Sequence, residues 1–267
     1  MSSRTSVLAE TDDFYRRLKA KGAAPLWESL GDLVPDEPRP ASVPMHWRYA
    51  ELRPLLMEAG SRITASQAER RVLVLENPGI KGGNLITESL YAGLQLVLPG
   101  EIAPTHRHSA SALRFIVEGT SGYTTVSGER AMMHPGDLIL TPSWTFHDHG
   151  NLGGEPVVWL DGLDVPIVNM LNTGFIEHYH KESQPLTVAT GDSLIRYGSN
   201  VLPVEHRSDI LHSPVFTYPY ERSRAVVTWL SQNDPINECH GFKVQYSNPL
   251  NGAYPLPTIS PFLQLLP

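Results

Sequence analysis

The chain has one cysteine among its 267 residues, which excludes an internal disulfide framework and is typical of proteins from a reducing compartment. It also lacks any apolar run near the ~20 residues that a membrane-crossing helix needs. The residues that follow Met1 are polar, acidic and aromatic, without the apolar core of a secretion signal. These absences indicate a cytoplasmic protein that does not bind a membrane.

Positive charge is scarce as well. The 21 lysines and arginines are outnumbered by 28 acidic residues, the net charge is −7, and the basic residues form no run. Because nucleic-acid phosphates are bound by clustered lysine and arginine, a nucleic-acid partner is not expected.

Proline and glycine, in contrast, are plentiful, with 23 and 21 residues spread along the chain. Short apolar stretches lie between them at residues 71–75, 92–98, 113–118, 122–126, 137–141 and 157–163. Short strands separated by turn residues favour an antiparallel sandwich or barrel over a helical bundle. The fold is therefore expected to be mainly β.

Helices are expected at residues 11–21, 47–58, 168–175 and 222–230. Thr11 can cap the first helix, and Gly60 is expected to end the second. The prolines between these two helices predict an extended arm that wraps over a body or a neighbouring subunit. A second, weaker β-rich stretch is expected to begin near residue 191.

The most informative residues are three histidines in the expected barrel. His106 and His108 stand one residue apart, so on a strand their side chains share a face. His147 follows on a later strand and can complete a set of three metal ligands. Imidazole binds iron, zinc, nickel and copper alike, so these residues by themselves do not identify the metal.

The spacing around these histidines resembles the two motifs of the cupin family. The first motif runs from Gly100 to His106 and His108, and Ala112 and Leu113 stand where a glutamate ligand usually follows, which points to three-histidine members. The second motif consists of Gly136, Pro142, His147 and Asn151. Trp144 replaces a glycine of this second motif.

Wider stretches, from about residue 10 to the end, resemble gentisate 1,2-dioxygenase and its salicylate- and hydroxynaphthoate-cleaving relatives. The matching segments are residues 25–27, 106–109, 114–119, 141–144, 146–149, 159–164 and 216–222. This resemblance implies a jelly-roll cupin barrel, Fe(II) as the cofactor, and a homotetramer.

Members of this family have two cupin barrels, which sets the expected domain organisation. We expect an N-terminal helical arm over residues 1–69 and the first barrel, with the metal site, over residues 70–165. A connection and a partial second cupin are expected over residues 166–267, because the chain ends where the second barrel opens.

The resemblance implies that gentisate and O2 are converted to maleylpyruvate, with ring opening between the carboxyl-bearing carbon and the adjacent hydroxyl-bearing carbon. Three neutral ligands leave the charge of Fe(II) uncancelled, which suits an anionic aromatic substrate. Two alternatives stay open. One is salicylate or 1-hydroxy-2-naphthoate as the substrate, and the other is an inert, truncated cupin that binds only metal or ligand.

Arg114 is the first of the residues expected around the substrate. It lies an even number of positions after His108, so it can point inward, and a guanidinium can hold a carboxylate in bidentate fashion. An inter-strand salt bridge is the alternative role. Arg70 could supply a second positive charge, with a solvated strand edge as its alternative.

The resemblance to the family implies further catalytic and substrate-binding residues. His149 shares the face of His147 and could be a hydrogen-bond partner or proton acceptor for the substrate, and Asp161 could orient His149 or Arg114. Gln95 could point its amide into the barrel, while Tyr91 and Trp159 could contact the aromatic ring or simply be core residues. Outside this set, His178 and His180 are expected in the connection, without a role.

Overall fold

The computed structural model describes residues 12–206 and 209–266, and the chain divides into two compact units at Ala41 and Ser42. In the first unit, residues 12–20 are helical and are followed by α2 (Leu26–Leu33), which buries none of its described residues. The expected helix at residues 11–21 is thus observed, although Thr11, its proposed cap, lies outside the described residues.

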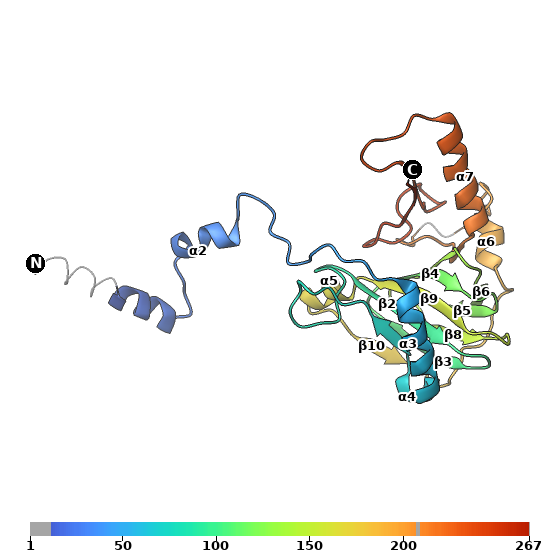
Figure 1. The fold of residues 1–267 in the computed structure, drawn as a ribbon, viewed down its shortest axis with the longest axis horizontal. Coiled ribbons are helices and arrows are strands. Elements are labelled where there is room, and N and C mark those ends of the chain that lie inside the picture. The colour runs from blue at the N-terminus through green and yellow to red at the C-terminus, as the bar shows by residue number, and fades with distance from the viewer. Residues whose placement is uncertain (1–11, 207–208, 267) are drawn as a thin grey trace, which may run out of the picture. The chain divides into compact units, whose positions relative to one another are not determined.

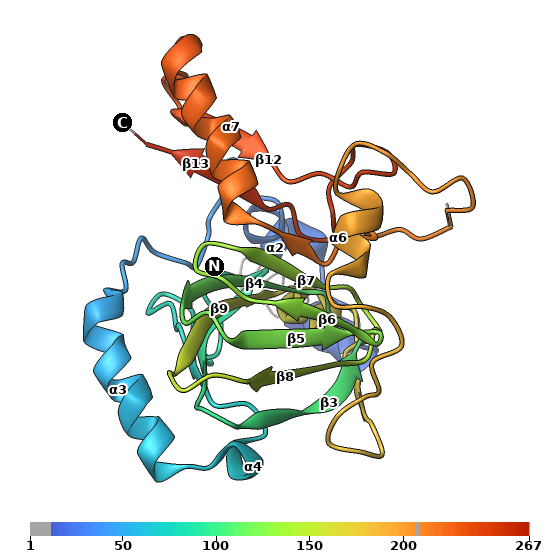
Figure 2. The same cartoon turned by 90° about the vertical axis from the view of Figure 1, so that its right-hand side faces the viewer.

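The second unit contains two antiparallel sheets that form the barrel (Figure 2). Among the described residues, the six-stranded sheet has the order β1 (Val72–Val74), β2 (Tyr91–Val97), β9 (Val157–Leu163), β4 (Ala112–Glu118), β7 (Leu138–Thr141) and β11 (Thr217–Tyr218). The five-stranded sheet has the order β10 (Ile176–His178), β3 (Ile102–His108), β8 (His147–Asn151), β5 (Gly122–Val126) and β6 (Glu129–Met132). The expected strands all lie in these sheets, and the mainly β fold is confirmed.

The β5–β6 hairpin illustrates how the local sequence sets a turn. Ser127 and Gly128 join the two strands, and both have positive φ, 48° and 84°. A two-residue loop with positive φ at both positions matches the right-handed twist of the flanking strands, and glycine adopts this conformation without strain.

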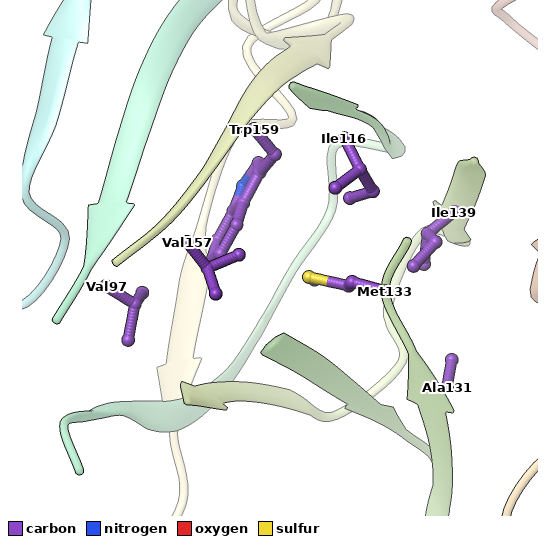
Figure 3. Packing of buried hydrophobic residues seen from close by; sticks show 7 residues of the cluster. All are labelled: Val97, Ile116, Ala131, Met133, Ile139, Val157 and Trp159. Atoms are coloured by element: carbon purple, nitrogen blue, oxygen red, sulfur yellow. The ribbon is translucent and has the colours of Figure 1, made fainter. Parts of the chain in front are cut away.

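The core of the barrel lies between the two sheets. Its largest side chain is Trp159, which is fully buried, and Met133 points toward Trp159 and Val157 (Figure 3). The other members of this cluster are Val97, Ile116, Ala131 and Ile139. This packed cluster forms the apolar core of the barrel.

Helix α3 (Tyr49–Arg62) lies along the outside of the six-stranded sheet (Figure 1, Figure 2). Its buried Leu56 packs against Leu94 and Leu96 of β2. The expected stop at Gly60 is wrong, because α3 continues through this residue. A Cβ at Gly60 would lie 3.0 Å from Leu96 Cδ2, so this glycine permits close packing of the helix on the sheet. A short helix, α4 (Ala65–Ala68), follows and is capped by Thr64.

The segment after the barrel contains three helices and a small sheet among its described residues. These elements are α5 (Val165–Met170), α6 (Asp192–Tyr197), α7 (Tyr220–Asn233), β12 (Phe242–Gln245) and β13 (Phe262–Leu265). The β-rich stretch expected from residue 191 is wrong at its start, where Gly191 and Asp192 begin α6. Strands β12 and β13 pair with each other, and α7 packs on both.

Helix α7 is joined to the barrel at its first residue. The backbone N–H of Tyr220 donates to Asp137 Oδ1 at 2.8 Å, and Asp137 lies in the turn before β7. Pro219 precedes the helix and provides no side-chain cap, so Asp137 supplies the acceptor from a distant part of the chain. The expected boundaries at residues 69/70 and 165/166 stay a prediction.

No helix in the described part of the chain is long and apolar enough to cross a membrane.

Candidate active site

The three histidines of the two motifs meet inside the barrel. His106 and His108 lie on β3 and His147 lies on β8, and His106 is the register partner of His147. Each of the three offers one ring nitrogen, and these nitrogens all lie within 4.8 Å of one another. The residues are therefore placed to bind a single ion.

Hydrogen bonds to carbonyl groups fix two of these rings. Nδ1 of His108 lies 2.7 Å from the Ala110 carbonyl oxygen, and Nδ1 of His147 lies 2.9 Å from that of Thr145. A carbonyl oxygen only accepts, so each Nδ1 carries the proton and each Nε2 has a free lone pair. His147 Nε2 is buried without a hydrogen-bond partner in the described structure. A buried, unpaired acceptor of this kind fits a metal ion as its missing partner.

The electrostatic surroundings keep the three imidazoles neutral. Burial and the nearby Arg70 lower the pKa of His106 to about 2, and burial also lowers the pKa of His108. Burial followed by the charge of Arg114 lowers the pKa of His147 well below its ordinary value. Since only the unprotonated nitrogen binds a metal, the site is in its ligating form at neutral pH.

Arg114 is buried beside the histidines and is held at three positions. Its Nε lies 3.2 Å from Asp161 Oδ1, its Nη1 donates to Thr141 Oγ1, and its Nη2 lies 3.3 Å from His149 Nε2. Arg114 and Asp161 are register partners on β4 and β9. The guanidinium is therefore fixed in orientation and still carries N–H groups for a ligand.

Arg70 contacts the histidine cluster at His106. Its Nη2 donates to the Pro104 carbonyl oxygen at 2.7 Å and approaches His106 Nδ1 at 3.1 Å. Burial, followed by repulsion from Arg114, lowers the pKa of Arg70 to about 10, so this guanidinium stays charged at neutral pH. Two fixed positive charges thus face a neutral histidine set.

A cavity of about 230 Å³ opens onto these groups. Its lining includes the three histidines and both arginines, and also Tyr91, Gln95, Asp161, Val72, Leu163, Val165 and Ile176. Nε2 of Gln95 is buried and has no hydrogen-bond partner within the described structure. The cavity thus combines apolar walls with a few polar groups, as is common for small-ligand sites.

Two residues expected at the substrate are buried and are not among the residues that line the cavity. Trp159 belongs to the packed core, with its ring 5.3 Å from that of His149, and it does not contribute to the lining. His149 is 1% exposed and is not among the lining residues; it contacts Arg114, and its ring lies 5.6 Å from that of His147. Direct contact of either residue with a substrate stays a prediction.

The structure also places residues at the site that sequence reasoning missed. Strand β10 pairs with β3 so that His178 is opposite His106, with ring centroids 6.4 Å apart. His178 was expected in the connection without a role, and its ligand-like spacing from His180 was the available signal. The apolar wall residues Val72 and Ile176 come from distant strands and gave no signal in the sequence.

Comparison with known proteins identifies the family. Residues 93–164 match the cupin domain. The chain is 50% identical over 266 residues to gentisate 1,2 dioxygenase 1 of Aquipseudomonas alcaligenes, covering 100% of this chain and 77% of that protein. It is 43% identical to gentisate 1,2-dioxygenase of a Ralstonia species, covering 94% of this chain and 71% of that protein.

Comparison with a solved structure also shows similarity to a ring-cleaving dioxygenase. Salicylate 1,2-dioxygenase from Pseudoaminobacter salicylatoxidans, determined as adducts with gentisate, superimposes with a TM-score of 0.86 at 33% identity, covering 94% of this chain and 71% of that one. The resemblance in sequence thus extends to the fold and to the elements that carry the histidines. The chain belongs to the gentisate 1,2-dioxygenase family of cupin ring-cleaving dioxygenases.

Proposed function

We propose that this protein is an Fe(II)-dependent dioxygenase that converts gentisate and O2 to maleylpyruvate in aromatic acid catabolism. The observation that carries the proposal is the set of three neutral histidines opening onto a cavity that also contains a fixed, buried arginine. The names of the similar proteins support gentisate as the substrate.

His106, His108 and His147 would hold the iron, and in His108 and His147 the carbonyl hydrogen bonds at Nδ1 leave Nε2 free for it. Bound iron would hold the carboxylate and adjacent hydroxyl of the substrate and pass electrons from the aromatic ring to dioxygen. Because all three ligands are neutral, an anionic substrate is favoured at the metal.

The protein itself would bind and orient the aromatic acid. Arg114 faces the cavity with its plane fixed by Asp161 and Thr141, so it can take the substrate carboxylate in one orientation. Arg70 adds a second positive charge close to His106. The apolar residues of the wall, such as Val72 and Ile176, would exclude water from the ring.

Gln95 could donate a hydrogen bond to an oxygen of the aromatic acid. Its buried amide has an N–H donor without a partner in the described structure. An acceptor on the substrate would satisfy this group. Tyr91 lines the same wall and could contact the ring.

The test is to load the purified protein with Fe(II) under anaerobic conditions and then add gentisate and air. Oxygen uptake and the ultraviolet absorbance of maleylpyruvate are followed together, with His106→Ala as the control. Iron-dependent turnover that is lost in the variant supports the proposal. Iron binding without oxygen uptake would mean that the protein is an inert cupin. Faster turnover of salicylate or 1-hydroxy-2-naphthoate in parallel reactions would identify that compound, and not gentisate, as the preferred substrate.

Three further assignments belong to this proposal. We infer that the protein acts in the cytoplasm, consistent with its single, exposed cysteine. We also infer a homotetramer, with the N-terminal arm as a contact between subunits, which sedimentation or gel filtration would test. The division into an arm, a first cupin barrel and a partial second cupin, as expected from the sequence, is the third.

A further inference from the structure

We propose that Asp164 is a positioning residue of the metal site, which acts through one peptide group to hold the ligand His108 in place. The inference rests on the proposed function for His108 as an iron ligand. It gives a role to a buried carboxylate that is not among the residues lining the cavity, and it extends the site to the segment after the barrel.

The peptide group between Ala110 and Ser111 links the two side chains. The Ala110 carbonyl oxygen lies 2.7 Å from His108 Nδ1 and, because a carbonyl only accepts, receives its proton. The Ser111 N–H donates to Asp164 Oδ1 at 2.8 Å. This carbonyl and this N–H belong to one planar, trans peptide unit, on which they point in opposite directions. Asp164 therefore fixes the direction of the carbonyl group that holds His108.

The same link affects the electron density of the ligand. Ala110, Ser111 and Asp164 are only 4%, 3% and 1% exposed, so these hydrogen bonds are shielded from water. Hydrogen bonds that form a chain in such surroundings polarise one another. The carboxylate at the N–H end of the peptide makes the carbonyl at the other end a stronger acceptor for His108 Nδ1. A stronger hydrogen bond at Nδ1 makes Nε2 a better donor to a metal ion.

The position of Asp164 in the chain would suit a different task. It directly precedes α5, where an aspartate side chain commonly caps the first backbone N–H groups of the helix. Here the side chain makes no cap hydrogen bond to α5. Pairing of β9 with β4 places Leu163 opposite Ala112, so the carboxylate that follows Leu163 lies beside Ser111 instead. The carboxylate is thus directed to the peptide group next to the metal ligand.

The second carboxylate oxygen is held by the segment after the barrel. Thr258 Oγ1 donates to Asp164 Oδ2, since an ionised carboxylate can only accept. On either side of Thr258, the buried Leu256 and Ile259 belong to the same apolar cluster as Leu140 of β7. This packing anchors Thr258 on the barrel, where it keeps the carboxylate turned so that Oδ1 faces the backbone N–H.

The variants that test this are Asp164→Ala, which removes the acceptor, and Asp164→Asn, which keeps an oxygen acceptor and removes the charge. Thr258→Val removes the hydroxyl, and Thr258→Ser retains it. Asp137→Ala is the matched control, because Asp137 is also buried and also accepts from backbone N–H groups, but its partners His134 and Tyr220 are not members of the histidine cluster. Fe(II) affinity is measured without oxygen by competition with a chromogenic chelator, and stability by thermal unfolding of the metal-free protein.

We expect Asp164→Ala to weaken Fe(II) binding about 10- to 100-fold, as is typical when a metal ligand loses its outer partner. Asp164→Asn and Thr258→Val should lose less affinity, and Thr258→Ser should remain near the unmodified protein. Asp137→Ala should lower the thermal stability and leave the Fe(II) affinity unchanged. The inference is overturned if Asp164→Ala binds Fe(II) as tightly as the unmodified protein, or if Asp137→Ala loses as much affinity as Asp164→Ala.

A second readout depends neither on activity nor on iron. In metal-free protein labelled with ¹⁵N-histidine, the Nδ1 proton of His108, assigned with a His108→Gln variant, should resonate far downfield because of its short hydrogen bond. Asp164→Ala should shift this resonance upfield and speed its exchange with solvent, whereas Asp137→Ala should change neither. An unchanged resonance in Asp164→Ala would refute the inference. If the unmodified protein did not bind Fe(II), the proposed function would fail, and this resonance would still decide whether Asp164 positions His108.

Discussion

Asp161 and Arg114 form a buried ion pair across β9 and β4, with 3.2 Å between Oδ1 and Nε and side-chain exposures of 7% and 4%. Burial raises the pKa of Asp161, while the charge of Arg114 acts in the opposite direction. The pair lies in the cavity wall, so it links the stability of the barrel to the orientation of the group proposed to bind the substrate.

The first prediction concerns this pair. Asp161→Asn should lower the free energy of unfolding by about 3–5 kcal/mol, because it leaves the buried charge of Arg114 without its counter-charge. Chemical denaturation monitored by fluorescence measures the change. Asp192→Asn is the control, since it breaks the surface pair with Arg196 and should cost less than about 1 kcal/mol. Similar costs for the two variants would contradict the importance of the buried pair.

The second prediction is that Arg114→Lys binds gentisate about 10- to 100-fold more weakly, in line with the loss of a hydrogen bond to a charged group. A lysine ammonium cannot contact Asp161, Thr141 and His149 at once and still present a planar face. Titration of the anaerobic, iron-loaded protein gives the affinity, and its metal content should be unchanged. Arg53→Lys, in an exposed pair with Glu118, serves as the control. If Arg114→Lys lost iron, its role would be to support the fold.

The third prediction distinguishes the three proposed iron ligands from His178, which lies close to them. Alanine at His106, His108 or His147 should abolish stoichiometric iron binding, measured by elemental analysis after desalting. His178→Ala is the comparison, because its ring lies only 6.4 Å from that of His106 but does not belong to the cluster of converging nitrogens. Iron loss in His178→Ala comparable to that in His106→Ala would show that the site includes a fourth histidine.

The fourth prediction uses three glycines to separate backbone strain from steric overlap. A Cβ at Gly136 would lie 2.5 Å from the Tyr220 ring, and this residue also has a φ of +90°. Gly100 has a φ of +75° but no described atom within 4 Å, and Gly154 has neither constraint. Thermal unfolding should therefore show that Gly136→Ala destabilises most, Gly100→Ala by about 1 kcal/mol, and Gly154→Ala not at all.

The ranking of these three variants by loss of stability tests whether the contact between the barrel and α7 stabilises the protein. Gly136 and Asp137 contact the first residue of α7 through the ring and the backbone N–H of Tyr220. If Gly136→Ala were no worse than Gly100→Ala, the contact with Tyr220 would not contribute to stability.

Several features of the fold could be predicted from local sequence patterns. Apolar stretches bounded by glycine and proline predicted the barrel strands, and the Ser127-Gly128 turn joins β5 to β6. Gly60 shows the limit of such patterns. From helix propensity alone, Gly60 is predicted to end the helix. The structure shows that it lies inside α3, where the lack of a side chain permits close packing against Leu96.

The sequence by itself determined the metal-site candidates, because alternation along a strand places His106 and His108 on one face whatever their surroundings. It also pointed Arg114 inward by the same alternation. Only the tertiary structure decided that Thr258 reaches Asp164, that His178 faces His106, and that Trp159 belongs to the core. These contacts join residues that are distant in the chain, and their partners are set by the pairing and packing of whole strands, which no local spacing encodes.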